Sequence, residues 1–339
     1  MTATVLYCNV TNSSGIISAV ITTNHDSPVA NMNVECRTSS LTLGDIVTVD
    51  MGYVGNHDVK FTGYVKQIEK KVPDNTYIIT AADALIRAQD YFLVASDPAH
   101  PQSYKNIKAE TLVGNLLAFP GLTNYEGEDT AFTFGVSRAF EINLVFIYEY
   151  THMIVDALTY AMWADQDGKV WMQNRKPYVM VNQFPENAQP GWTADTNQTG
   201  YTLTDEKAVE ISYGKDERYL RNRVVVYGNE GIQATATRTA NSLPVGFVKS
   251  AVISLPSMID NTPLAQSIAD YNVDLLCRIT ETIQATVIGD PVLEARKCLV
   301  VDSDQVPQNG LWYIFGCDHN LSNAGYTTSL TLKRMVRDD

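Results

Sequence analysis

The sequence lacks the features that would place it in a membrane, in an export pathway or on nucleic acid. It has no run of about 18 apolar residues, so no membrane-spanning helix is expected. The segment Met1 to Cys8 has neither a basic nor an apolar region, so we expect no signal peptide. Lys and Arg number 25 against 38 Asp and Glu, a net charge of −13. Because the phosphate backbone is bound through clustered cations, sequence-specific nucleic-acid binding is not expected.

Motifs that carry chemistry are also missing. The patterns Gly-x-Ser-x-Gly, Gly-x-Gly-x-x-Gly and the phosphate-binding loop do not occur, and no two of the five histidines have metal-ligand spacing. We therefore assign no catalytic, cofactor-binding or metal-binding residue, expect no cofactor, and predict that the protein is not an enzyme. The 38 acids leave carboxylate pairs for glycoside hydrolysis open.

Three polar groups in the sequence are interpreted as structural. Asp165-x-Asp167-Gly168 resembles the start of a calcium loop, but the later acid ligand would fall in the segment 171–175, so a hairpin turn is favoured. The neighbours Asp318 and His319 are interpreted as a structural pair within a strand, and His152 as a partly exposed residue of a helix.

The chain is poor in cysteine, and its cysteines are scattered. They are an odd number with no Cys-x-x-Cys spacing, which predicts buried free thiols in a reducing compartment. The five are Cys8, Cys36, Cys277, Cys298 and Cys317.

What the chain has in abundance is strand-forming sequence. Of its residues 45% are hydrophobic and 19% charged, which is typical of a globular protein, and 339 residues suffice for two or three domains. The last segment, Tyr326 to Arg334, alternates Leu330 and Leu332 with polar residues, as a half-buried strand does. A chain that ends in such a strand is expected to close a sheet or barrel there.

Residues 1–92 are predicted to form a small antiparallel β-barrel. The segment Leu41 to Val49 alternates with a turn or bulge at Gly44-Asp45, and Tyr77 to Asp83 gives another strand. Gly63 interrupts the strand 59–65 and therefore indicates a bulge or a close backbone approach.

Residues 93–206 are predicted to form an α+β insert followed by a long polar loop. A linker is expected at 96–103, a helix at 109–119, and the best amphipathic helix of the chain at 151–163. Residues 182–206 are rich in Asn, Gln, Pro and Gly and are expected to form the loop.

Residues 207–339 are predicted to form a second β-barrel that contains a helix at about 262–277. Thr262 is expected to be the N-cap of this helix and Pro263 its first residue. The segment 222–228 is predicted to be a strong strand. The fold class is therefore mainly β, with two antiparallel barrels and a smaller α+β module.

Several of these segments, in this order, resemble the baseplate hub proteins of phage tails, the late control protein D family. The segments are Gly44–Val49, Phe61–Val65, Tyr77–Asp83, Asn222–Gly228, Ile288–Pro291 and, most strongly, Gly325–Lys333. The resemblance implies tail-tube-like barrels and a homotrimeric hub that joins the hexameric tail tube or distal tube protein to a trimeric spike or tail-tip protein. It also implies a virion protein of the tail baseplate, assembled in the bacterial host cytoplasm, with DNA passing through a central channel. A glycan-degrading or cell-wall-degrading tail-tip enzyme and a receptor-binding module are the alternatives.

The two barrels are further predicted to be copies of one another. Leu41, Val47 and Val49 would correspond to Leu293, Leu299 and Val301, while Gly63 would correspond to Gly316 and Tyr77 to Tyr326. The family commonly has a Gly-Asp-like turn where this chain has Arg296-Lys297, so the sequence alone leaves that turn open.

Overall fold

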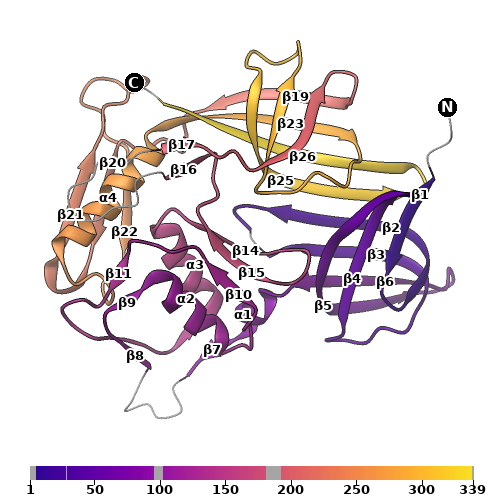
Figure 1. Cartoon of the computed structure of the whole chain (residues 1–339), viewed down its shortest axis with the longest axis horizontal. Helices are drawn as coiled ribbons and strands as arrows, with labels where there is room; N and C mark the ends of the chain where they lie inside the picture. Colours follow the sequence, from indigo (N-terminus) through magenta and orange to yellow (C-terminus); the bar gives the residue numbers. More distant parts are fainter. Residues whose placement is uncertain (1–4, 28, 95–101, 181–191, 338–339) are drawn as a thin grey trace.

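The computed structural model describes residues 5–27, 29–94, 102–180 and 192–337. Two barrels made of long strands lie beside a module that carries all four α-helices of the described residues (Figure 1). The predicted fold class, mainly β with two barrels and an α+β module, is confirmed.

The first barrel consists of the first six strands. Their order in the sheet is β1-β4-β5-β6-β3-β2, and every neighbouring pair is antiparallel. Alternating side chains such as Met32, Val34 and Cys36 of β3 are buried in its core. The strands are β1 (Leu6–Val10), β2 (Ser13–Asn24), β3 (Asn31–Ser39), β4 (Ile46–Tyr53), β5 (Asn56–Lys71) and β6 (Thr76–Asp83).

The second barrel combines two separate stretches of the chain. Its sheet order is β18-β24-β25-β26-β23-β19, and Trp312, Ile314 and Leu332 are buried in its core. The strands are β18 (Gln198–Thr204), β19 (Ala208–Asp216), β23 (Arg278–Ile288), β24 (Cys298–Asp302), β25 (Gly310–Ser322) and β26 (Gly325–Arg337).

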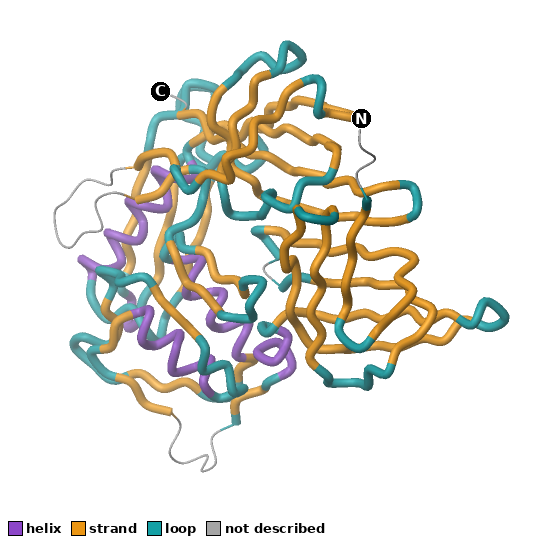
Figure 2. Tube along the Cα trace, turned by 45° about the vertical axis from the view of Figure 1, so that its right-hand side comes forward, coloured by secondary structure: helices purple, strands orange, loops and turns teal. Residues whose placement is uncertain are grey.

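One strand pair joins the two barrels into a single twelve-stranded sheet. Strand β2 pairs antiparallel with β25, so that Ser18 lies opposite Ser322 and Asn24 opposite Gly316. The long strands of both barrels consequently run side by side in Figure 2.

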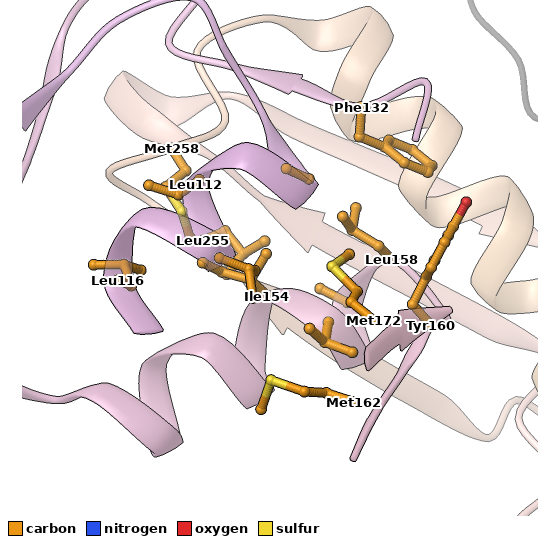
Figure 3. Close-up of a cluster of buried hydrophobic side chains, with 14 of the residues drawn as sticks. Leu112, Leu116, Phe132, Ile154, Leu158, Tyr160, Met162, Met172, Leu255 and Met258 are labelled. Atoms are coloured by element: carbon orange, nitrogen blue, oxygen red, sulfur yellow. The ribbon is translucent and has the colours of Figure 1, made fainter. Parts of the chain in front are cut away.

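The α+β module has its own hydrophobic core. Helices α2 (Ala109–Ala118) and α3 (Ile147–Ala157) pack together, and Leu112, Leu116 and Ile154 point into a cluster with Met258 (Figure 3). The small sheet β10 (Tyr125–Gly127), β15 (Val170–Gln173) and β14 (Ala161–Ala164) contributes Met162 and Met172. The remaining short strands are β7 (Phe92–Leu93), β8 (Gln102–Tyr104), β9 (Ile107–Lys108), β11 (Thr133–Phe134), β12 (Phe140–Ile142), β13 (Val145–Phe146), β16 (Tyr178–Met180) and β17 (Trp192–Ala194), and α1 is Ile86–Asp90.

Residues 223–276 depart from the expected second barrel. Strands β20 (Arg223–Tyr227), β21 (Gln233–Thr237) and β22 (Ser250–Ser254) form a separate sheet, against which α4 (Thr262–Leu276) packs. Val224 and Val226 of β20 belong to the core of the α+β module. This stretch is therefore an excursion from the second barrel into the module, and that part of the prediction was wrong.

Two helix predictions need correction at their ends. The helix predicted at 151–163 begins at Ile147 and ends at Ala157, because Thr159 has a φ of 65° and the chain then forms strand β14. The helix at 262–277 is confirmed, but its N-cap is Asn261, whose side chain accepts a hydrogen bond from the Leu264 backbone N–H at 2.8 Å.

The predicted loop at 182–206 is partly wrong. Residues 198–204 form strand β18, in which Thr199, Tyr201 and Leu203 are buried. Residues 182–191 of that loop, and 96–101 of the predicted linker, lie outside the described residues.

The remaining structural predictions concern single groups. The Asp165 carboxylate accepts hydrogen bonds from the backbone N–H groups of Asp167 and Lys169 and from the Trp171 indole, so this segment is a hairpin turn, as favoured. All five cysteines are free thiols, of which only Cys8 is partly exposed. The described helices include none with the length and apolar character to cross a membrane.

Candidate assembly site

The two barrels share one strand order. Written in chain order, β1 to β6 of the first barrel correspond to β18, β19, β23, β24, β25 and β26 of the second, because both sheets follow the same sequence of neighbours. One pair differs in direction, since β1 is antiparallel to β4 whereas β18 is parallel to β24. The predicted duplication is therefore confirmed in strand order, while the direction of the first strand differs between the two barrels.

Irregularities recur at matching places in the two barrels. The β2–β3 register shifts between Ile16 and Ser18, and the β19–β23 register shifts between Ala208 and Glu210. Likewise, the β5–β6 shift at Val65/Gln67 matches the β25–β26 shift at Ile314/Gly316. Because a bulge needs a defined backbone geometry, shared bulges fix which residues correspond.

The turn that the sequence left open at Arg296-Lys297 is the same turn as Gly44-Asp45. Gly44 has a φ of 85° and donates its backbone N–H to Val65 O at 2.9 Å. Arg296 has a φ of 69° and donates its N–H to Ile314 O, the equivalent atom, at 2.8 Å. This chain therefore keeps the turn while placing an arginine where the first barrel has glycine.

The predicted residue correspondences are partly right. Val47 lies opposite Gly63 in the β4–β5 pair, and Leu299 lies opposite Trp312 in the β24–β25 pair. The match of Val47 with Leu299 therefore holds, but Gly63 corresponds to Trp312 and not to Gly316. Tyr77 corresponds to Thr328 and not to Tyr326, because Thr80 and Thr331 occupy equivalent positions after the shared bulge. The glycine spacing was misleading because Gly63 serves close packing and not a bulge: an added Cβ would lie 2.2 Å from Ala82 O.

Buried cations connect the three parts of the molecule. The Arg296 guanidinium donates to Asn24 O of β2 at 2.7 Å and lies 5.3 Å from the centre of the Trp163 ring in the module. The Lys60 ammonium of β5, only 3% exposed, lies 3.4 Å from the Glu294 carboxylate next to β24. Both cations are largely removed from water, so breaking these contacts would leave a buried charge without its partner. The contacts therefore favour one arrangement of the two barrels and the module.

His319 occupies a buried polar network at the junction of the barrels. Its Nε2 lies 3.0 Å from Leu293 O and must donate to it, because a carbonyl only accepts, so Nδ1 accepts from the Tyr326 hydroxyl at 2.7 Å. Burial, helped by the charge of Lys60, lowers the pKa of His319 to about 3. Asp318 points to the opposite face of the strand, so His319 has the predicted structural role but the two residues do not form a pair.

Acid is expected to destabilise the protein through His319. Below pH 6.5, its usual pKa, the unfolded chain binds a proton that the folded chain excludes until the pH approaches 3. The free energy of unfolding should therefore fall by about 1.4 kcal/mol per pH unit in this window. The measurement is urea unfolding of the wild type and His319→Gln between pH 7 and pH 4, with the difference between the two shrinking as pH falls.

Asp83 makes an opposite contribution to the pH dependence of the unfolding free energy. Subtracting the values for His319→Gln from those for the wild type cancels this contribution. Burial raises the pKa of the Asp83 carboxyl to about 7, so its protonation favours the folded state as pH falls from 7. The same contribution is present in the wild type and in His319→Gln. A pH-independent difference between them would contradict the assignment to His319.

The twelve-stranded sheet that joins the two barrels has one face toward the barrel cores and one face away from them. The face away from the cores, called the open face of the joined sheet, is polar. Registered pairs across β3, β2, β25, β26, β23 and β19 align a row of partly or fully exposed side chains. The row is Asn31, Thr22, Asp318, Ser329, Thr286 and Glu210. A second row contains Asn33, Val20, Asn320 and Thr327. These rows present hydroxyls, amides and carboxylates.

Known proteins resemble this chain in structure. A tail protein from Neisseria meningitidis MC58 matches with a TM-score of 0.67 and 12% sequence identity, over 97% of each chain. The 43 kDa tail protein of prophage MuSo2 from Shewanella oneidensis matches with a TM-score of 0.67 and 13% identity, over 98% of this chain and 100% of that one. An E. coli component of the type VI secretion system, described as similar to the T4 bacteriophage tail proteins gp27 and gp5, matches at 0.56 with 7% identity over 96% and 76%.

Sequence comparison finds no such similarity. No protein-family model matches the chain, and no curated protein matches it. The structural matches extend over nearly the whole chain, so they include both barrels and the α+β module. The chain therefore has the fold of phage tail proteins, which it shares with a type VI secretion component.

Proposed function

We propose that this protein is the structural hub at the tip of a phage tail or a related contractile particle. In this proposal three copies form a closed ring that joins the hexameric tail tube to a trimeric spike. The main observation in support of this proposal is the duplicated barrel. Two barrels of the same strand order in each chain give six similar barrels in a trimer. A trimer of this kind can meet six tube subunits with near-equivalent surfaces, which resolves the symmetry mismatch.

The polar face of the joined sheet supports a channel for DNA. Asp318 and Glu210 repel phosphate, and the neutral side chains Thr22, Ser329 and Asn320 of the same face carry no charge that would retain it. We propose that this face lines the channel. The net charge of −13 has the sign expected for a surface that DNA must pass without binding.

The proposal places the protein in the virion tail and its assembly in the host cytoplasm. Its partners are the tail tube or distal tube protein on one side and the spike or tail-tip protein on the other. The organisation into a first barrel, an α+β module and a second barrel is part of the proposal, with residues 223–276 assigned to the module.

The mass in solution tests the proposal. Light scattering of the purified protein at micromolar concentrations should give three times the chain mass of 37.5 kDa. A monomeric mass at every concentration, both alone and with the spike protein present, would contradict it. Soluble fragments released from peptidoglycan by the purified protein would instead support the tail-tip enzyme.

A further inference from the structure

Several strand edges of the joined sheet have no partner among the described residues, and two of them belong to β19 and β5. Strand β19 pairs with β23 on one side, and its other edge ends the sheet. Strand β5 pairs with β4 only up to Tyr64, which lies opposite Ile46, so Gln67 to Lys71 pair with β6 alone. Unpaired edges are sites where another strand can add.

The equivalent edges of the other barrel are paired with each other where the two barrels meet within the chain. Strand β2, the counterpart of β19, pairs with the second half of β25, the counterpart of β5. The chain therefore already contains one barrel-to-barrel contact of this type. The reciprocal contact, β19 with β5, cannot form within one chain, because six strands separate β5 from β19 in the sheet order.

We infer that β19 of one copy pairs antiparallel with the second half of β5 of the next copy. This inference rests on the proposed ring and specifies its interface. Each copy then contributes the run β5-β6-β3-β2-β25-β26-β23-β19, and three copies continue the sheet around the channel. The contact is heterologous, so it produces a ring when the rotation between copies closes.

The shared bulges set the register of this contact. Within the chain, Val20 lies opposite Asn320 and Thr22 opposite Asp318. Transferring each residue to its counterpart gives five opposed pairs between neighbouring copies. They are Ser212 with Lys71, Tyr213 with Lys70, Gly214 with Glu69, Lys215 with Ile68, and Asp216 with Gln67.

Burial differs between the paired and unpaired edges as this contact requires. Ile21 of β2 and Cys317 of β25 are fully buried. Their counterparts Tyr213 and Ile68 are only half-buried, although both pack against a barrel core. A neighbouring copy would cover these two side chains in the way that β2 and β25 cover each other.

Cross-linking between copies tests the register. The double variant Ser212→Cys/Lys71→Cys places two thiols opposite each other across the contact, within disulfide reach. In an antiparallel sheet the Cα atoms of successive opposed pairs are alternately closer together and farther apart. The double variant Lys215→Cys/Ile68→Cys therefore tests a pair of the other spacing. Under mild oxidation at least one of them should give covalent dimers and trimers that disappear on reduction.

The matched control is Ser212→Cys/Lys66→Cys. Lys66 lies on the same strand but five residues out of register, about 16 Å away, so this variant should remain uncross-linked. Thermal unfolding of each reduced variant checks that it is folded.

The outcomes separate the interface from the ring. Cross-linking in register and not in the control supports both. A trimeric mass with cross-linking in neither register variant, or with equal cross-linking in the control, overturns the β19–β5 contact and leaves the hub proposal standing. A monomeric wild type at all concentrations overturns both.

Discussion

Replacing Gly63 by alanine is expected to cost the first barrel at least about 3 kcal/mol of unfolding free energy or to prevent folding. The new Cβ would lie 2.2 Å from Ala82 O and 2.5 Å from Cζ of Phe61. Real Cβ atoms do not approach a backbone oxygen so closely, so β5 and β6 would have to separate. Urea unfolding at a fixed protein concentration measures the loss.

Gly316→Ala is the matched control for this prediction. Gly316 also lies within a strand, but the nearest atoms to an added Cβ, those of Thr331, lie at 3.4 Å, an ordinary van der Waals distance. Its substitution should change the unfolding free energy by less than about 0.5 kcal/mol. Equal effects at the two glycines would show that Gly63 is not a site of close approach.

Arg296→Ala is expected to destabilise the protein by about 2–4 kcal/mol. The substitution removes the hydrogen bond to Asn24 O and the contact with the Trp163 ring, which connect the second barrel to the first barrel and to the module. It also removes the positive charge that opposes the burial-induced rise in the pKa of Asp83. The measurement is urea unfolding at pH 8, where the Asp83 carboxyl is mostly ionised.

Arg296→Gly should be less destabilising than Arg296→Ala by about 1 kcal/mol. The φ of 69° is costly for alanine but not for glycine. Gly44→Ala measures this backbone cost alone, because the φ there is 85° and nothing lies within 4 Å of an added Cβ. If Arg296→Ala unfolds like the wild type, the guanidinium does not hold the three parts together.

The sequence predicted the elements whose pattern is locally complete. Strand β26 was predictable because Leu330 and Leu332 alternate with polar residues, and helix α2 because its apolar residues follow helical spacing up to Pro120-Gly121. In contrast, the end of α3 was missed because Ala161 and Met162 continue the helical spacing by chance while lying in a strand.

Long-range pairing was the part that the sequence could not supply. Strand β18 looks polar, and only the alternation of Tyr201 and Leu203 signals a half-buried strand. The run Val224 to Val226 is buried on both faces, so periodicity cannot tell which sheet it joins. The matching bulges and the turn at Arg296 became visible only through their hydrogen-bond partners, which lie far away in the chain.

The candidate interface was likewise beyond the sequence. The resemblance implies a trimer, but the edge residues Gln67 to Lys71 and Ser212 to Asp216 carry no motif. The structure points to them because their counterparts in the other barrel are already paired. Whether a strand lies at the edge of a sheet depends on which strands pair with it. Neither composition nor residue spacing reveals this.

Electron microscopy of the purified protein is the decisive test of the hub proposal. We expect a closed ring with three-fold symmetry, in which six barrel-sized lobes surround an open channel and the sheet continues from β19 of one copy to β5 of the next. Single 37.5 kDa particles, open filaments, or rings with a number of copies other than three would contradict it.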